Sequence, residues 1–176
     1  MDGGNHIANL ETVQTVIKAL YAAALCYGLI SDVKSLKIPN EVPIALSALF
    51  FLNYWLAPGG SLWHHLLPGA LGFLVTFIFY FAGVMGAGDV KLISALMLWA
   101  GTRDALAFLL LMSIIGGVFA GLLLIAGRLI ALSVIADRFI PSRRFKNWAQ
   151  RGIFPYGVAI CAAGLILMPS FFAAPA

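Results

Sequence analysis

Six apolar runs alternate with short polar or glycine-rich connections along the chain, and this pattern constrains the fold more than any other feature. A run of about 20 apolar residues is long enough to cross a bilayer as a helix. Only 10% of the residues are charged, whereas about 25% are charged in a typical soluble domain. We therefore expect an all-α, polytopic membrane protein with about six transmembrane helices, and a single integral-membrane domain over residues 1–176. The expected spans are residues 13–30, 41–57, 62–84, 89–100, 105–127 and 154–172.

Basic residues lie almost entirely on one side of this topology. The connections after the first, third and fifth runs hold nine Lys and Arg residues, and the other two hold only Arg103. Because basic residues stay on the cytoplasmic side, we expect these three connections in the cytoplasm and both termini outside. The same rule accounts for a basic cluster that could also bind nucleic acid, so we expect membrane lipid and no nucleic acid as a partner. The cluster comprises Arg138, Arg143, Arg144, Lys146 and Arg151.

Cysteine and histidine residues give no indication of a metal site. Cys26 and Cys161 each lie alone in an apolar run, without a C-x-x-C pair or a histidine at ligand spacing. His64 and His65 are adjacent, so on a helix they point about 100° apart, and an interfacial position is the simpler interpretation. We expect neither a metal nor a cofactor.

Two of the seven acidic residues lie at the ends of apolar runs, on the same side of the expected topology. Asp32 ends the first run and Asp89 begins the fourth, and the expected topology places both on the cytoplasmic side. Ionisable groups at membrane depth are costly and usually mark a functional site. For Asp89 a structural alternative remains, in which the acid caps the following helix while Lys91 extends to the membrane surface.

The chemistry that suits two adjacent carboxyl groups is that of an aspartic protease. Such groups share a proton because both cannot ionise cheaply. One can then accept a proton from water while the other polarises a peptide carbonyl. Two alternatives remain for Asp32 and Asp89. They could form a proton relay in an ion-coupled transporter or channel subunit, although the internal repeats common in transporters are not evident. A non-catalytic assembly protein, in which Asp89 and Lys91 make a structural contact, is the third interpretation.

Three motifs contain these acids or flank them in the chain. They are Asp32 followed after five residues by Ile38-Pro39-Asn40, then Gly86-Ala87-Gly88-Asp89-Val90-Lys91, and finally Phe154-Pro155-Tyr156-Gly157-Val158-Ala159. In this order they resemble motifs of the type IV prepilin peptidases, membrane aspartic proteases of the GxGD class. The resemblance implies that Asp32 and Asp89 are the catalytic pair. It implies a supporting role for Ile38, Pro39, Asn40, Gly86, Gly88, Lys91, Pro155, Tyr156 and Gly157.

The resemblance also implies a substrate and a location. Prepilin peptidases remove the short leader of prepilin or pseudopilin precursors at the cytoplasmic face of the bacterial inner membrane. Larger members carry paired C-x-x-C motifs in a cytoplasmic insertion that is tied to methylation of the new N-terminus. In this chain the first cytoplasmic connection, residues 31–40, contains no Cys. The chain therefore resembles the short, peptidase-only form of Tad/Flp pilus systems, and methyltransferase activity is not expected.

Local patterns add expectations about individual motif residues. Asn40 is a good N-cap for the helix that follows it. Lys91 lies about 200° from Asp89 on a helix, so it is expected to reach the membrane surface or the backbone of another segment. Gly86 and Gly88 are expected to let the chain turn sharply and to let a substrate backbone approach Asp89.

Overall fold

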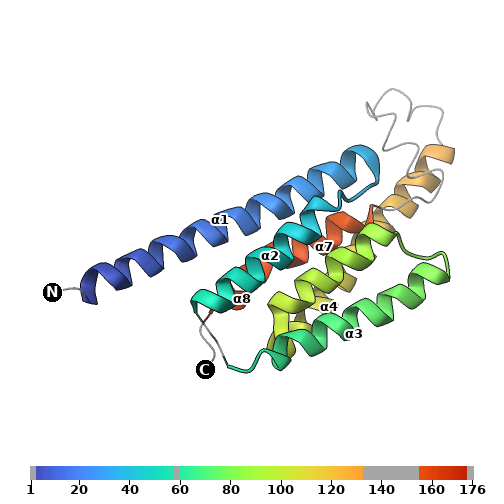
Figure 1. Cartoon of the computed structure of the whole chain (residues 1–176). Helices are drawn as coiled ribbons and strands as arrows, with labels where there is room; N and C mark the ends of the chain where they lie inside the picture. Colours follow the sequence, from blue (N-terminus) through green and yellow to red (C-terminus); the bar gives the residue numbers. More distant parts are fainter. Residues whose placement is uncertain (1–2, 58–59, 133–154, 174–176) are drawn as a thin grey trace.

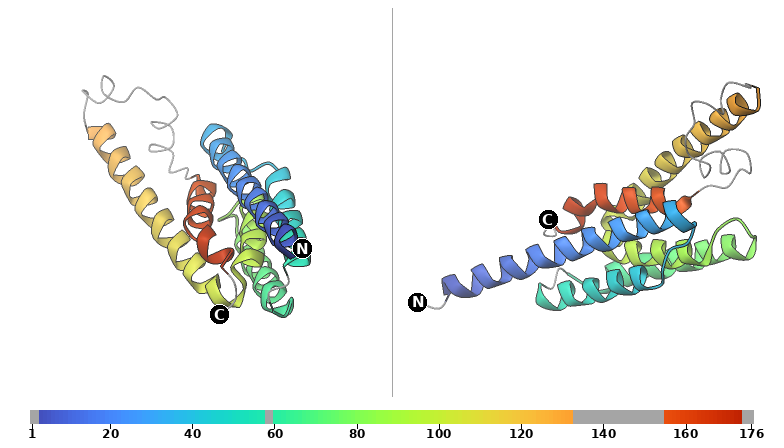
Figure 2. Two further views of the ribbon diagram at one scale, coloured as in Figure 1. Left: turned by 90° about the vertical axis from the view of Figure 1, so that its left-hand side faces the viewer. Right: turned by 90° about the horizontal axis from the view of Figure 1, so that it is seen from above.

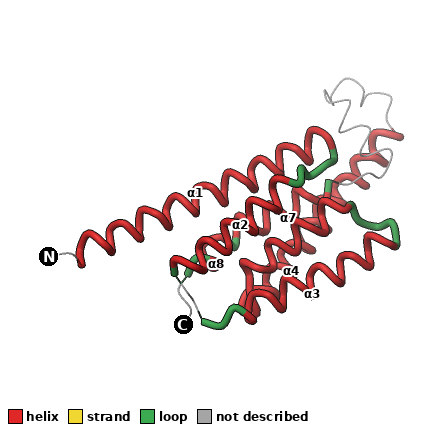
Figure 3. The backbone as a smooth tube through the Cα atoms, in the orientation of Figure 1, coloured by secondary structure: helices red, strands yellow, loops and turns green. Residues whose placement is uncertain are grey.

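The computed structural model describes residues 3–57, 60–132 and 155–173, and every regular element in these ranges is a helix (Figures 1 and 3). The predicted all-α class is therefore confirmed. The basic cluster and the first residue of the sixth predicted span lie outside the described residues. The helices are α1 (Gly3–Ser35), α2 (Glu41–Leu56), α3 (Trp63–Phe81), α4 (Ala87–Leu132), α7 (Tyr156–Ile166) and the short α8 (Met168–Phe171).

Helix α4 contains two of the predicted spans. It is interrupted at Gly101, where φ is 57° and ψ is −169°. A positive φ is readily available only to glycine, and a Cβ at this position would lie 3.0 Å from Nδ1 of His65. The second arm of α4 consequently returns toward the end of the bundle at which the first arm begins (Figures 1 and 2).

The helices have the length and apolar character that a membrane protein requires. Three segments are long and apolar enough to cross a bilayer: Glu11–Ser35, Trp63–Phe81 and Ala87–Ile125, the last of which includes both arms of α4. Helices α2 and α7 are shorter and also apolar. Together these helices make the chain a polytopic membrane protein, as the alternation of apolar runs predicts.

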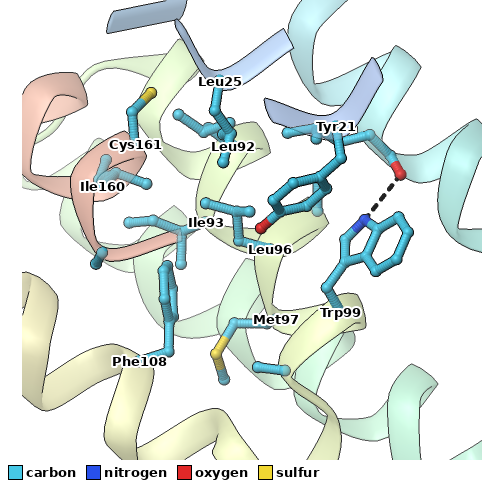
Figure 4. Close-up of a cluster of buried hydrophobic side chains, with 14 of the residues drawn as sticks. Tyr21, Leu25, Leu92, Ile93, Leu96, Met97, Trp99, Phe108, Ile160 and Cys161 are labelled. Carbon is cyan, nitrogen blue, oxygen red and sulfur yellow. Dashed lines mark hydrogen bonds between the residues drawn. The ribbon is translucent and has the colours of Figure 1, made fainter. Parts of the chain in front are cut away.

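A core of buried side chains joins α1, α2, α4 and α7 (Figure 4). Tyr21 is fully buried and its ring meets that of Trp99 edge-on, with 5.0 Å between the centroids. Buried aromatic residues with polar atoms need hydrogen-bond partners. The Tyr21 hydroxyl donates to the carbonyl of Gly164 at 3.2 Å, and Nε1 of Trp99 donates to the carbonyl of Leu46 at 3.0 Å. Each bond links two different helices.

Helix α3 packs closely against the first arm of α4. A Cβ at Gly69 would lie 2.6 Å from a methyl carbon of Leu98, so a larger residue would require the Leu98 side chain to move. Ser94 Oγ donates a hydrogen bond to the carbonyl of Gly69 at 3.0 Å, and His65 Nδ1 lies 2.9 Å from the carbonyl oxygen of Leu98. These contacts hold α3 against α4 and so position the glycine-rich loop between them.

Two predicted helix boundaries near the candidate site were wrong. The first helix does not end near Ile30 but continues to Ser35. In this extension Ser35 Oγ donates to the carbonyl of Ser31 at 2.8 Å, and Ser31 Oγ donates to the carbonyl of Lys37, beyond the helix end, at 2.9 Å. The fourth helix begins at Ala87 rather than at Asp89. Both acids therefore lie inside the terminal turns of helices.

Candidate active site

Asp32 lies in the last turn of α1 and is buried, with 4% of its surface exposed. Its backbone carbonyl accepts a hydrogen bond from the N–H of Leu36 at 2.8 Å, which closes the helix. The side chain points away from the rest of α1 toward the start of α7. A buried carboxyl needs polar partners, and α7 supplies one.

The first turn of α7 provides a backbone donor to this carboxylate. The N–H of Val158 donates to Oδ2 of Asp32 at 3.2 Å. The first N–H groups of a helix have no partner within it and are usually capped by the preceding side chain. Here the N-cap residue is Pro155, which makes no side-chain cap. Asp32 therefore caps α7 from another helix, and it shares the Val158 N–H with the carbonyl of Pro155, which accepts from it at 3.2 Å.

Gly157 makes this approach possible. A Cβ at this position would lie 2.7 Å from Oδ2 of Asp32 and 2.9 Å from Cδ1 of Ile38. Any larger residue would push one of these groups away. The close packing gives a physical reason for glycine in the third motif.

Asp89 lies in the first turn of α4 and is partly buried. Its Oδ2 accepts a hydrogen bond from the N–H of Gly86 at 3.2 Å. This bond closes the glycine-rich loop onto the helix. It differs from the cap of the structural alternative, because Asp89 lies inside the first turn and accepts from a residue that precedes the helix. A Cβ at Gly86 would lie 3.1 Å from the same oxygen. A side chain at position 86 would therefore contact the Asp89 carboxylate and change its position.

Both carboxylates line one cleft of about 690 Å³. The cleft lies between the α1–α2 connection and the α3–α4 connection, at the end of the bundle where α1 ends and α4 begins (Figure 1). Leu36, Ile38, Val84, Met85 and Tyr156 also line it.

Ile38 connects the three sequence motifs. A Cβ added at Gly88 would lie 3.0 Å from the Cβ of Ile38 and 3.2 Å from the carbonyl oxygen of Ile38. Its Cδ1 lies against Gly157, as described above. Gly88 thus admits a neighbouring segment of this chain rather than a substrate, because Ile38 already occupies the space.

Asn40 and Lys91 join the starts of α2 and α4. The Lys91 ammonium group donates a hydrogen bond to Oδ1 of Asn40 at 2.9 Å. Asn40 does occupy the N-cap position of α2, but its side chain makes no capping hydrogen bond. The prediction for Asn40 was therefore wrong in its contact, since the charged Lys91 is the stronger donor for that oxygen. Lys91 reaches another segment, as expected, but through a side chain rather than the backbone.

The remaining polar candidates lie elsewhere. His64, His65, Arg103 and Asp104 line a second cavity, of about 550 Å³, at the opposite end of the bundle (Figure 1). Cys26 and Cys161 are free thiols. Among the residues that the structure describes, no three His, Cys, Asp or Glu side chains gather as a metal site would require.

Two features of the cleft were not expected from the sequence. The Val158 N–H is a backbone group, and the third motif was its only signal. Leu36 carries no signal at all, since nothing in the local pattern marks it as a residue with positive φ. Tyr156, by contrast, was named for its motif and lies at the cleft, 40% exposed.

Comparison with known proteins identifies the family of this chain. The model of the type IV leader peptidase family matches residues 19–121, which is more than half of the chain. This range includes Asp32, Asp89 and the first two motifs, but not the third. No curated protein and no solved structure shows a significant match. The chain therefore belongs to the type IV leader peptidase family of proteases.

Proposed function

We propose that this protein is an aspartic endopeptidase in which Asp32 and Asp89 activate water to cleave the leader of prepilin-like precursors. The observation that carries the proposal is the placement of these two carboxylates in one cleft, from helices far apart in the chain. Membership of a protease family supplies the reaction class. The remaining motif residues hold the two acids rather than take part in the chemistry.

The reaction requires one carboxylate and one carboxylic acid. The carboxylate takes a proton from water, whose oxygen attacks the peptide carbonyl carbon while the acid donates a hydrogen bond to the carbonyl oxygen. The tetrahedral intermediate then breaks its C–N bond, and a proton passes to the leaving amine. The pair ends with one proton between them, as it began.

One oxygen of each acid accepts a backbone hydrogen bond. Oδ2 of Asp32 accepts from the Val158 N–H, and Oδ2 of Asp89 accepts from the Gly86 N–H. We assign the two Oδ1 atoms to water and to the peptide carbonyl. Backbone donors on rigid helix ends fix the orientation of both groups in advance, which lowers the cost of reaching the transition state.

The proposal places the cleft at the cytoplasmic face of a bacterial inner membrane. Lys34, Lys37 and Lys91 lie near it in the chain, and basic residues stay on the cytoplasmic side. The connection between α1 and α2 is only residues 36–40 and contains no Cys. This supports a single-domain, peptidase-only enzyme of the Tad/Flp pilus type, without methyltransferase activity.

Co-expression with a candidate precursor tests this function. The membrane fraction should convert a prepilin or pseudopilin precursor to a product smaller by the mass of its leader, as measured by mass spectrometry. Asp32→Asn and Asp89→Asn serve as matched controls, because each keeps the size of the side chain and loses its acid–base chemistry. Proton flux through proteoliposomes without any cleavage of precursors would instead support a transport relay.

A further inference from the structure

Leu36 combines two features that are unfavourable for folding. Its φ is 55°, the only positive φ outside glycine among the described residues. The left-handed conformation is unfavourable for an ordinary residue, and glycine is the usual choice at this position after a helix. Its large apolar side chain is also 37% exposed. A glycine would close α1 equally well and at lower cost.

Lipid contact does not readily account for this exposure. The apolar segment of α1 ends at Ser35, and Leu36 lies beyond it in a connection that includes the exposed Lys37. The side chain lines the cleft that holds Asp32 and Asp89. Residues held in rare backbone conformations concentrate at functional sites.

The cleft has a second apolar wall, formed by the α3–α4 connection. Val84 is 58% exposed and Met85 is partly buried against the core. Both line the same cleft as Leu36. Its volume, about 690 Å³, falls within the usual range of ligand-binding pockets. Apolar groups from two connections therefore flank the two carboxylates, and Lys37 lines the cleft beside Leu36.

We propose that Leu36, together with Val84 and Met85, forms an apolar subsite that selects an uncharged, apolar side chain next to the cleaved peptide bond. This inference rests on the proposed function and adds a specificity residue to it. Leu36 contacts the substrate and takes no part in the proton transfers. Its left-handed backbone directs the side chain into the cleft and directs the following residues toward Ile38, which fixes the position of the subsite relative to Asp32.

Purified enzyme and a precursor that the wild type cleaves provide the test. The residues on either side of the cleaved bond are changed in turn to Ala, Leu and Asp, and kcat and KM are measured for each. Leu36→Gly and Leu36→Asn both suit a left-handed backbone and remove the apolar side chain. Leu36→Met keeps an apolar side chain of similar size. Val33→Ala is the matched control, because Val33 is 38% exposed near the same helix end and does not line the cleft.

The expected result is a change in selectivity without a loss of chemistry or of stability. Leu36→Gly and Leu36→Asn should raise KM for the apolar-flanked substrate about tenfold or more, the usual effect of lost apolar contacts in a specificity pocket. Their kcat should stay within about twofold of wild type, the signature of lost uniform binding. The melting temperature of Leu36→Gly should equal or exceed that of wild type. Leu36→Met and Val33→Ala should keep the wild-type preference.

The experiment distinguishes a failure of the apolar subsite from a failure of the proposed function. If the wild type cleaves the precursor but Leu36→Gly and Leu36→Asn keep its preference, or lose kcat at unchanged KM, the subsite is overturned while the proposed function stands. An equal effect of Val33→Ala would overturn it as well. If the wild type cleaves no precursor at all, the proposed function fails, and the subsite fails with it.

Discussion

Oδ2 of Asp32 accepts a hydrogen bond from the backbone N–H of Val158 at 3.2 Å, so a carboxylate on α1 caps the first turn of α7. One side chain thereby has a structural partner and a proposed catalytic role. The two roles can be separated, because a cap needs only an oxygen acceptor whereas acid–base chemistry needs a titratable group.

Substitutions at Asp32 should separate these roles. Asp32→Asn keeps an acceptor for Val158, so it should leave the protein folded while lowering kcat by about three orders of magnitude or more. Asp32→Ala should lose the same activity and also about 1 kcal/mol of stability, the usual cost of a missing cap. Precursor cleavage and thermal melting in detergent measure the two effects. Substantial turnover by Asp32→Asn would rule out the mechanism.

The two acids should behave as one catalytic unit. Asp89→Asn should abolish cleavage as Asp32→Asn does, and the double variant should be no less active than either single variant. Effects within such a unit are not additive. A double variant whose rate equals the product of two partial losses would show that the two side chains act separately.

Gly157→Ala should lower both activity and stability. The new Cβ would lie 2.7 Å from Oδ2 of Asp32, so either the carboxylate or α7 must move. Gly117→Ala is the control, since nothing lies within 4 Å of the Cβ it adds, and alanine favours a helix by about 1 kcal/mol over glycine. If Gly157→Ala melts and cleaves like Gly117→Ala, Asp32 does not depend on this packing.

Alanine substitutions at the two glycines before Asp89 should have different effects on activity and melting temperature. Gly88→Ala places a methyl group 3.0 Å from Cβ of Ile38, so activity and melting temperature should fall together. Ile38→Ala in the same chain should restore neither, because alanine keeps the Cβ and the backbone that the new methyl group meets. Gly86→Ala instead meets the Asp89 carboxylate at 3.1 Å and should lower kcat with little change in melting. Normal cleavage by both single variants would leave the loop without a role in the site.

Lys91 should support the site without acting on the catalytic pair. Its bond to Asn40 joins α4 to α2, so Lys91→Ala and Asn40→Ala should each reduce kcat/KM roughly tenfold, about 1.4 kcal/mol. The double variant should add little to either single loss, because both remove one contact. Lys91→Arg keeps the charge and should keep most activity. The pH profile of kcat should retain its shape in every case, and a shift by a full pH unit would show that Lys91 acts on the pair directly.

Membrane orientation can be measured independently of cleavage. A cysteine introduced at Ser35 should react with a membrane-impermeant thiol reagent only from the cytoplasmic side, and one introduced at Ser61 only from the outside. The basis is the excess of Lys and Arg in the odd-numbered connections. Reaction of both positions from the same side would remove the argument that the cleft faces the cytoplasm.

Local sequence patterns were sufficient for the helices, the membrane class and the motifs. Long apolar runs make helices in a bilayer because no water is available to bond an open backbone, and this holds whatever the helices later contact. The turn at Gly101 and the glycine-rich loop before Asp89 are likewise visible as breaks in those runs. The motifs themselves pointed to Asp32 and Asp89 by resemblance.

The contacts among the motifs were decided only by tertiary structure. Asn40 is a residue type that commonly caps helices. Its side-chain oxygen nevertheless accepts from Lys91, because a charged donor from another helix outcompetes a backbone N–H. Asp32 caps α7, Ile38 fills the space beside Gly88 and Gly157, and Leu36 takes a left-handed backbone at the cleft. The contacts of Asn40, Asp32 and Ile38 depend on the packing of segments distant in the chain. A hydrogen-bonding or packing preference in one segment cannot specify which distant group will satisfy it.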